Sequence, residues 1–281
     1  FSLKKYPFIN LPSENQVNYM KIIDAHCHVY PPAIAAKAVN NIGHFYDINM
    51  YGAGTAEDLL KTGSNAGVTQ YLIFSVATTP RQTNSINEFI AQTMRENPQM
   101  KGLGTIHPDS ADLEGEINHL ADLGLLGVKM HHDFQIVPAD DPRCMKIYEL
   151  CATKHLPVLL HTGDKRYDYS NPNRVKNILR AFPDLTVIGA HFGGWSIWEE
   201  AAPQLADYPN FYVDSSSSFY ALSPAAAKDI IHAYGSERIL FGSDYPMWDV
   251  AYDLKYLNSL NLSDDDLENI LNRTAKSIFK L

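Results

Sequence analysis

The segment DAHCH at residues 24–28 places two histidines at a spacing that can bind a metal ion. His26 and His28 are two residues apart, so on an extended strand both imidazoles point to the same face. Two imidazole nitrogens on one face can bind one ion. An HxH pair alone is equally typical of a core histidine bonded to a backbone carbonyl, so its meaning depends on the other polar side chains around it.

Further histidines and aspartates stand at the ends of short apolar runs that are rich in β-branched residues. They are His107, His131, His161, His191, Asp214 and Asp244. A polar group buried at a strand end without a partner costs a few kcal/mol. Chance would rarely repeat so costly a placement, and the pattern therefore favours a shared chemical role.

The elements that must position these side chains are eight apolar runs that alternate with amphipathic stretches. The runs span residues 21–26, 70–76, 101–107, 126–131, 157–161, 185–191, 210–215 and 238–244. The helical candidates are residues 88–97, 113–123, 143–154, 173–181, 224–234 and 267–278, the last after a capping cluster at 263–266. This order predicts an α/β fold, a (β/α)8 TIM barrel, whose active site lies where the strands end.

One domain of residues 20–281 suffices for such a barrel. Residues 1–19 are mixed and polar and are treated as an N-terminal extension, with Met20 as an alternative natural start. The rival architecture is a doubly wound open sheet. The first run, however, leads into HCHVYPP, with no glycine-rich phosphate loop, which favours the barrel.

Composition narrows the class of protein. The 281 residues carry a formal net charge of −9 with no basic block, which argues against a nucleic-acid partner. Apolar runs fall short of the roughly 18 residues that a membrane span requires. Three cysteines in no framework spacing, and no signal peptide at the start, favour a cytoplasmic location. We therefore expect a small-molecule substrate, no membrane partner and an enzyme that could form a homodimer.

Five motifs together resemble the amidohydrolase superfamily, in particular its amidohydrolase-2 branch of metal-dependent barrel enzymes. They are DAHCH at 24–28, GVKMH at 127–131, LLHTG at 159–163, GAHFGG at 189–194 and FGSDYP at 241–246. By this resemblance the metal ligands would be His26, His28, His161 and Asp244. His191, at the end of the sixth strand, would be the catalytic histidine beside them.

The chemistry of these residue types agrees with the resemblance. Three neutral imidazoles and one carboxylate, without a thiolate, suit zinc best and leave manganese as an alternative. Such an ion lowers the pKa of a bound water to around 7. Asp244 could take the proton of that water and pass it to a leaving group. His191 could orient the water, polarise a carbonyl or stabilise an oxyanion.

Four further residues are candidates for substrate binding. Lys129 and His131 share parity on the fourth strand, so both should face the barrel mouth. Lys165 and Arg166 follow His161 closely, and an arginine can hold a substrate carboxylate through two hydrogen bonds. We expect Lys129 to stay an unmodified ammonium, paired with a carboxylate such as Asp24 or with the substrate, in an enzyme with a single metal ion.

The predicted function is hydrolysis of a small carbonyl compound such as an amide, a lactone or a carboxylated ring. The first alternative is decarboxylation, since the aminocarboxymuconate-semialdehyde and resorcylate decarboxylases are similar to this sequence. Those enzymes usually carry a GGxxPF segment and an arginine after the sixth strand, where this chain reads GGWSIWEEAAPQL. The second alternative is a metal-binding barrel without catalysis.

Overall fold

The computed structural model describes residues 21–281. Its strands are β1 (Ile22–His28), β2 (Val68–Phe74), β3 (Met100–Gly102), β4 (Gly104–Thr105), β5 (Val128–Met130), β6 (Val158–Leu160), β7 (Val187–Gly189), β8 (Phe211–Asp214) and β9 (Ile239–Leu240). Each strand pairs in parallel with the next along the chain, except that β3 and β4 do not pair with each other. The predicted N-terminal extension, residues 1–19, lies outside the described residues.

The strands close into a ring. Leu103 separates β3 from β4, and hydrogen bonds from Leu103 N to Ile73 O and from Gly104 N to Gly127 O keep both halves in one strand. Closure comes from Ala25 N, which donates to Phe241 O at 2.8 Å, and from a bridge between Cys27 and Tyr245. The predicted (β/α)8 barrel is therefore confirmed, with β3 and β4 as a single interrupted strand.

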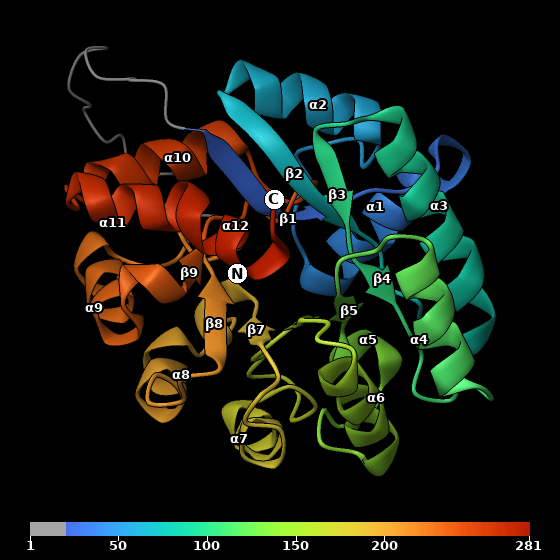
Figure 1. The fold of residues 1–281 in the computed structure, drawn as a ribbon. Coiled ribbons are helices and arrows are strands. Elements are labelled where there is room, and N and C mark those ends of the chain that lie inside the picture. The colour runs from blue at the N-terminus through green and yellow to red at the C-terminus, as the bar shows by residue number, and fades with distance from the viewer. Residues whose placement is uncertain (1–20) are drawn as a thin grey trace.

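Helices surround the ring of strands (Figure 1). They are α1 (Pro32–Tyr46), α2 (Ala56–Asn65), α3 (Thr83–Glu96), α4 (Leu113–Asp122), α5 (His132–Gln135), α6 (Pro142–Thr153), α7 (Pro172–Ala181), α8 (Trp198–Leu205), α9 (Pro224–Tyr234), α10 (Val250–Ser259), α11 (Asp264–Glu268) and α12 (Thr274–Phe279). The predicted capping cluster starts α11, where the Ser263 side chain accepts a hydrogen bond from Asp266 N. A π-helical turn, Asn269–Arg273, then separates α11 from α12 within the predicted 267–278 segment.

Alternate strand residues supply two separate cores. Leu159, Ile188 and Leu240 belong to the smaller cluster, which fills the barrel and includes Phe279 of α12. Val158 and Leu160 belong to the larger cluster between the strands and the helices. The polar strand ends are thus fixed from both sides by packed apolar side chains, which holds their geometry rigid.

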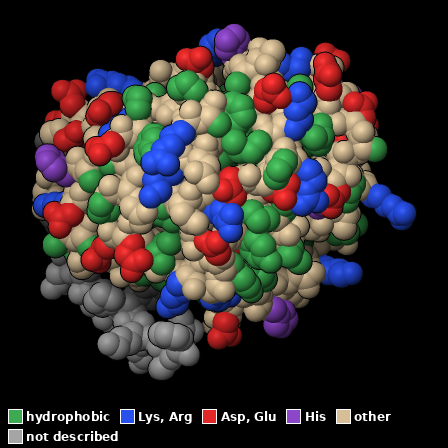
Figure 2. All heavy atoms as spheres, turned by 90° about the horizontal axis from the view of Figure 1, so that it is seen from below, with side chains coloured by type: hydrophobic (Ala, Val, Ile, Leu, Met, Phe, Trp, Pro, Cys, Tyr) green, Lys and Arg blue, Asp and Glu red, His purple; other side chains and the backbone are tan. Residues whose placement is uncertain are grey.

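No helix within residues 21–281 is long and apolar enough to cross a bilayer. On the face shown in Figure 2, acidic and basic side chains are interspersed. That face therefore presents no continuous basic surface of the kind that binds a phosphate backbone.

Candidate active site

The histidines and aspartates of the predicted site gather at the carboxyl ends of the strands. His26 and His28 lie on β1, His161 follows β6, and His191 follows β7. Asp244 follows β9, next to β1 in the closed ring. Because the ends of parallel strands meet at one rim of a barrel, residues more than 200 positions apart become neighbours.

Three of the four predicted metal ligands form a compact triangle, which we call the β1 group: His26, His28 and Asp244. The Nε2 atoms of the two histidines are 3.3 Å apart. Asp244 Oδ1 lies 3.2 Å from His26 Nε2 and 3.4 Å from His28 Nε2. Ligand atoms about 2.05 Å from a tetrahedral ion are separated by about 3.3 Å, so these spacings match one face of a zinc coordination sphere.

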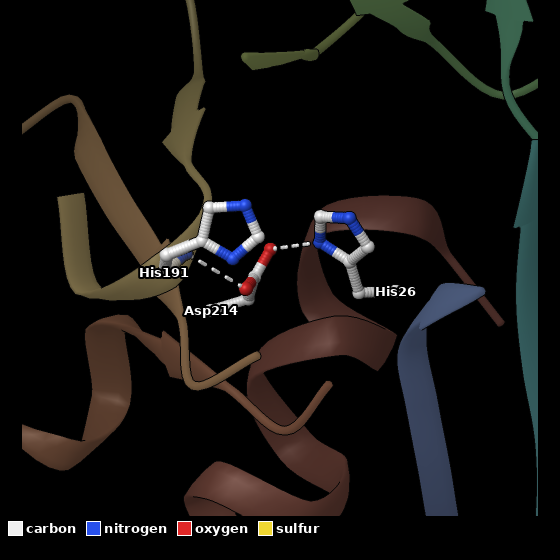
Figure 3. A group of neighbouring side chains, drawn as sticks. All are labelled: His26, His191 and Asp214. Atoms are coloured by element: carbon white, nitrogen blue, oxygen red, sulfur yellow. Dashed lines mark hydrogen bonds and ion pairs between the residues drawn. The ribbon is translucent and has the colours of Figure 1, made fainter. Parts of the chain in front are cut away.

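Asp214, at the end of β8, fixes the orientation of His26 (Figure 3). Its Oδ2 accepts a hydrogen bond from His26 Nδ1 at 2.8 Å, and its Oδ1 accepts from His191 N at 3.1 Å. Because His26 Nδ1 donates to Asp214, Nε2 is the nitrogen of the neutral ring that would bind a metal. A carboxylate that holds a ligand histidine in this way raises its basicity. Burial lowers the pKa of His26, as does Lys129, but the carboxylates of Asp214 and Asp244 outweigh both and raise it.

Asp244 is held in an ionised form. Burial opposes ionisation, but His26 and His28 beside the carboxylate keep the pKa of Asp244 well below its usual range. Ser217 Oγ donates a hydrogen bond to Asp244 Oδ2, which leaves Oδ1 to face the histidines. The segment after β9 comes close to β1 at Gly242, where a Cβ would lie 2.7 Å from His26 Cβ. Glycine at this position therefore allows the close contact.

Asp244 and His191 both adopt left-handed backbone conformations, with φ of 58° and 61°. Residues with side chains rarely take this conformation, and it clusters at functional sites because the surrounding structure must offset the strain. The two residues assigned catalytic roles from the sequence thus share a costly backbone geometry.

His191 presents an unprotonated nitrogen to the site. Its Nδ1 lies 3.1 Å from the backbone carbonyl of Ser216, which can only accept, so Nδ1 carries the hydrogen. His191 Nε2 then accepts from His161 Nδ1 at 3.0 Å. Burial lowers the pKa of His191 to about 4, so the ring is neutral at physiological pH.

His161, the fourth predicted ligand, lies outside the triangle. It belongs to a second cluster, the β5–β6 group of His131, Asp133 and His161. His161 Nε2 is buried without a hydrogen-bond partner, 3.6 Å from Asp133 Oδ2. The His131 ring stacks on the rings of His161 and Phe134, at centroid distances of 3.9 and 3.8 Å. The structure therefore places His161 beside the β1 group but does not bring its nitrogens into that group.

Lys129 faces the same mouth. Its Nζ lies 3.4 Å from His26 Nε2 and 5.1 Å from the centroid of the Phe74 ring. Burial lowers the pKa of Lys129 to about 8, which leaves the ammonium mostly protonated at neutral pH. The expected pairing with Asp24 is wrong, because Asp24 instead accepts hydrogen bonds from the backbone and hydroxyl of Ser243.

A pocket joins the two groups. Its lining consists of His26, His28, Ile42, Tyr46, Lys129, His131, Phe134, His161, His191, Asp244, Pro246 and Met247. The free volume is about 20 Å³, which is room for about one water-sized species. Ile42 and Tyr46 come from α1, a helix absent from the predicted set, so no sequence pattern pointed to them.

Lys165 and Arg166 do not line this pocket. Asp164 accepts two hydrogen bonds from Arg166, at 3.0 Å from Nε and 2.7 Å from Nη2. The Arg166 Nη1 donates to the backbone carbonyl of Phe45 at 2.8 Å. The backbone N–H of Lys165 donates to Ser196 Oγ at 3.0 Å. Arg166 therefore fastens the end of α1 to the loop after β6, instead of offering its guanidinium to the site.

The remaining rim histidines have structural partners. His107 Nδ1 accepts a hydrogen bond from Asp109 N, and His132 bonds to the hydroxyl of Tyr148. His44 is bonded to the carbonyl of Asn40 within α1. Asp214 was expected only as a strand-end residue, and its contact with His26 Nδ1 depends on a β8 to β1 approach that spacing along the chain does not reveal.

The donor set fits a divalent cation. Two imidazole nitrogens and an ionised carboxylate converge within 3.4 Å, an arrangement that is favourable around a positive charge. Imidazole and carboxylate donors suit zinc and manganese alike.

Comparison with known proteins shows others with the same fold. The structure superposes on an uncharacterized TIM-barrel protein from Bordetella bronchiseptica, with a TM-score of 0.77 and 22% identity, over 92% of this chain and 98% of that one. A dihydroxybenzoic acid decarboxylase from Polaromonas with bound manganese gives a TM-score of 0.70 at 14% identity, covering 93% and 97%. A probable 2-pyrone-4,6-dicarboxylic acid hydrolase from Acinetobacter baumannii gives 0.66 at 17%, covering 93% and 100%.

At these identities the superpositions establish the fold alone. Among curated protein sequences, no relative matches this chain. The amidohydrolase family model matches residues 23–281, which is nearly all of the described chain and includes every motif that carried the resemblance. The chain therefore belongs to the amidohydrolase family of metal-dependent barrel enzymes.

Proposed function

We propose that this protein is a metal-dependent hydrolase that acts on a small carbonyl compound, an amide, a lactone or a carboxylated ring. The observation that carries the proposal is the β1 group, whose three donor atoms are spaced as the ligands of one tetrahedral ion. We propose zinc as the ion, with manganese as the alternative that the same donors accept. His161 lines the same pocket, and we assign it as the fourth ligand.

A divalent cation held by these residues would lower the pKa of a coordinated water and polarise a substrate carbonyl. Asp244 is ionised and can accept a proton from the attacking water and pass it to the leaving group. His191 carries its hydrogen on Nδ1, and its Nε2 lone pair, which accepts from His161 Nδ1 in the structure, would orient that water once His161 turns to the metal. This tautomer makes His191 an acceptor, so stabilisation of developing negative charge falls to other residues.

Lys129 is the residue suited to that task. Its ammonium lies beside the donor atoms and can stabilise an oxyanion or hold a substrate carboxylate. The side chains of Ile42, Phe134 and Met247 provide an apolar wall on which the rest of a small substrate can pack.

The second candidate is a decarboxylase. Lys129 favours it too, since an ammonium beside the metal ligands could hold the carboxylate that leaves as carbon dioxide. Structural similarity to a decarboxylase and to a hydrolase does not separate the two reactions.

Isotope labelling would decide between them. Zinc-loaded protein is incubated in H2 18O with a panel of lactones, amides and aromatic carboxylates, and both products are followed by mass spectrometry. Hydrolysis incorporates one labelled oxygen into the product without release of carbon dioxide. Carbon dioxide release from a carboxylate, without incorporation of label into the organic product, would assign the decarboxylase reaction and overturn the proposal.

A further inference from the structure

Tyr46 is the side chain at the pocket for which neither the motifs nor the metal site provides a role. It occupies the last position of α1 and lines the pocket beside His131 and His161. Its hydroxyl lies 2.9 Å from His131 Nε2. Its ring packs edge to face against Phe45 and Trp195, at centroid distances of 4.8 and 5.0 Å, so the phenol has little freedom to move.

The direction of the hydrogen bond between Tyr46 and His131 follows from the other ring nitrogen. His131 caps α5, where its Nδ1 accepts a hydrogen bond from Phe134 N at 3.4 Å. A nitrogen that accepts an N–H carries no hydrogen, so the hydrogen of the neutral ring is on Nε2. His131 Nε2 therefore donates to Tyr46 Oη, and the hydroxyl hydrogen of Tyr46 remains free for another acceptor.

The His131 ring cannot easily turn to reverse this arrangement. It is held between Phe134 and His161, with interplanar angles of 7° to both rings. A hydroxyl that is fixed by a donor and packed on two sides is a preorganised hydrogen-bond donor. The pocket contains the acceptors of the β1 group on one side. Its donors are the charged ammonium of Lys129 and the neutral hydroxyl of Tyr46.

We propose that Tyr46 is a substrate-binding residue whose hydroxyl, aligned by His131, donates a hydrogen bond to a carbonyl or carboxylate oxygen of the substrate. The inference rests on the proposed function for the nature of that substrate. Because Tyr46 belongs to α1, the shape and position of this helix would determine which substrate oxygens the enzyme binds.

The test measures binding and not turnover, so it can be read even if the proposed reaction is wrong. Fluoroacetate is a small probe with acceptor oxygens, and its binding to the zinc-loaded full chain can be followed by 19F NMR. Tyr46→Phe removes the hydroxyl and keeps the ring. We expect its affinity for fluoroacetate to fall about 10-fold, the usual scale for one hydrogen bond to a charged acceptor.

Tyr167→Phe is the matched control, because Tyr167 stacks on the same Phe45 ring but does not line the pocket. Its affinity should stay within two-fold of wild type, and both variants should keep the wild-type thermal unfolding midpoint. Equal affinity in Tyr46→Phe and wild type would overturn the proposal, and so would a wild-type protein that does not bind fluoroacetate. If Tyr46→Phe lowers the unfolding midpoint, Tyr46→3-fluorotyrosine, which keeps the donor, must restore wild-type binding, and failure to do so counts against the role.

Discussion

The β1 group and the β5–β6 group both combine histidines with an aspartate, yet they are built differently. In the β1 group, the donor atoms are 3.2–3.4 Å apart. Asp214 accepts the hydrogen bond of His26 Nδ1, and Ser217 Oγ donates a hydrogen bond to Asp244 Oδ2. His26 Nδ1 and Asp244 Oδ2 do not face the common centre and both have hydrogen-bond partners, which is the arrangement expected of a rigid metal site.

The β5–β6 group is looser. Asp133 Oδ2 lies 3.6 Å from His161 Nε2 and 3.9 Å from His131 Nδ1, beyond hydrogen-bonding distance. Asp133 Oδ1 and His161 Nε2 are both buried without partners. The imidazoles of His131 and His161 are stacked face to face, so their nitrogens point along parallel planes. This arrangement suits packing better than coordination of one metal ion by both rings. The residue types in a cluster therefore do not identify a metal site by themselves. The distances between donor atoms, and the hydrogen bonds that orient the ligand side chains, do.

The largest predicted difference between the groups is in metal affinity. His28→Gln removes a donor of the β1 group and should weaken zinc binding by at least about 100-fold, above the effect of losing a supporting residue. His131→Gln should change it by less than about three-fold. Competition with a chromophoric chelator measures both variants, and a larger loss in His131→Gln would reverse our assignment of the two groups.

His191→Asn separates chemistry from metal binding. The zinc content should remain near the wild-type level, while turnover falls by roughly 100-fold, the scale for loss of one acid–base or positioning group. Metal analysis and steady-state kinetics on the same preparation provide the comparison. A variant that purifies without zinc would make His191 a metal ligand and our role for it wrong.

Asp214→Asn changes only the hydrogen bond that supports His26. The amide can no longer hold the same tautomer as strongly, so zinc affinity should fall by roughly 10- to 100-fold. Asp133→Asn is the matched change in the β5–β6 group and should cost less than about three-fold. Equal losses in the two variants would show that both carboxylates support the metal.

The smallest predicted effect is on stability against acid in the metal-free protein. Burial lowers the pKa of His28 to about 4, whereas an unfolded histidine titrates near 6.5. Below pH 6.5 the unfolded chain binds the proton and the folded chain does not, so the free energy of unfolding falls as the pH falls. Between pH 6.5 and 5.5 this histidine should cost about 1 kcal/mol.

Urea unfolding of wild type and His28→Gln, both treated with a chelator, tests this value. The variant lacks the titrating group, so its free energy of unfolding should fall less over the same pH range. Parallel pH profiles for the two proteins would contradict the lowered pKa of His28.

The sequence predicted the barrel well, because its strands are short apolar runs with polar ends and its helices are strongly amphipathic. It also predicted which residues would reach the mouth, such as His26, His191 and Asp244. It did not reveal Asp214 as the partner of His26, nor Tyr46 as part of the pocket. Those contacts join β8 to β1 and α1 to α5, and no local pattern encodes them.

Arg166 shows a further limit of the sequence. Its position after His161 indicated a substrate contact, but its guanidinium donates hydrogen bonds to the carboxylate of Asp164, two residues earlier, and to the carbonyl of Phe45. Four aromatic rings also lie within 5.4 Å of its guanidinium carbon, those of Phe45, Tyr46, Tyr167 and Trp195. Nearness in sequence to a ligand does not determine which way a long side chain turns.

X-ray absorption spectroscopy of zinc-loaded protein, combined with metal analysis, determines whether the β1 group binds the metal ion. We predict close to one zinc ion per chain, coordinated by nitrogen and oxygen atoms at about 2.0–2.2 Å. The histidine scattering should decrease in His28→Gln and remain unchanged in His131→Gln. Two ions per chain, or a signal that depends on His131 and not on His28, would contradict a single metal site built on the β1 group.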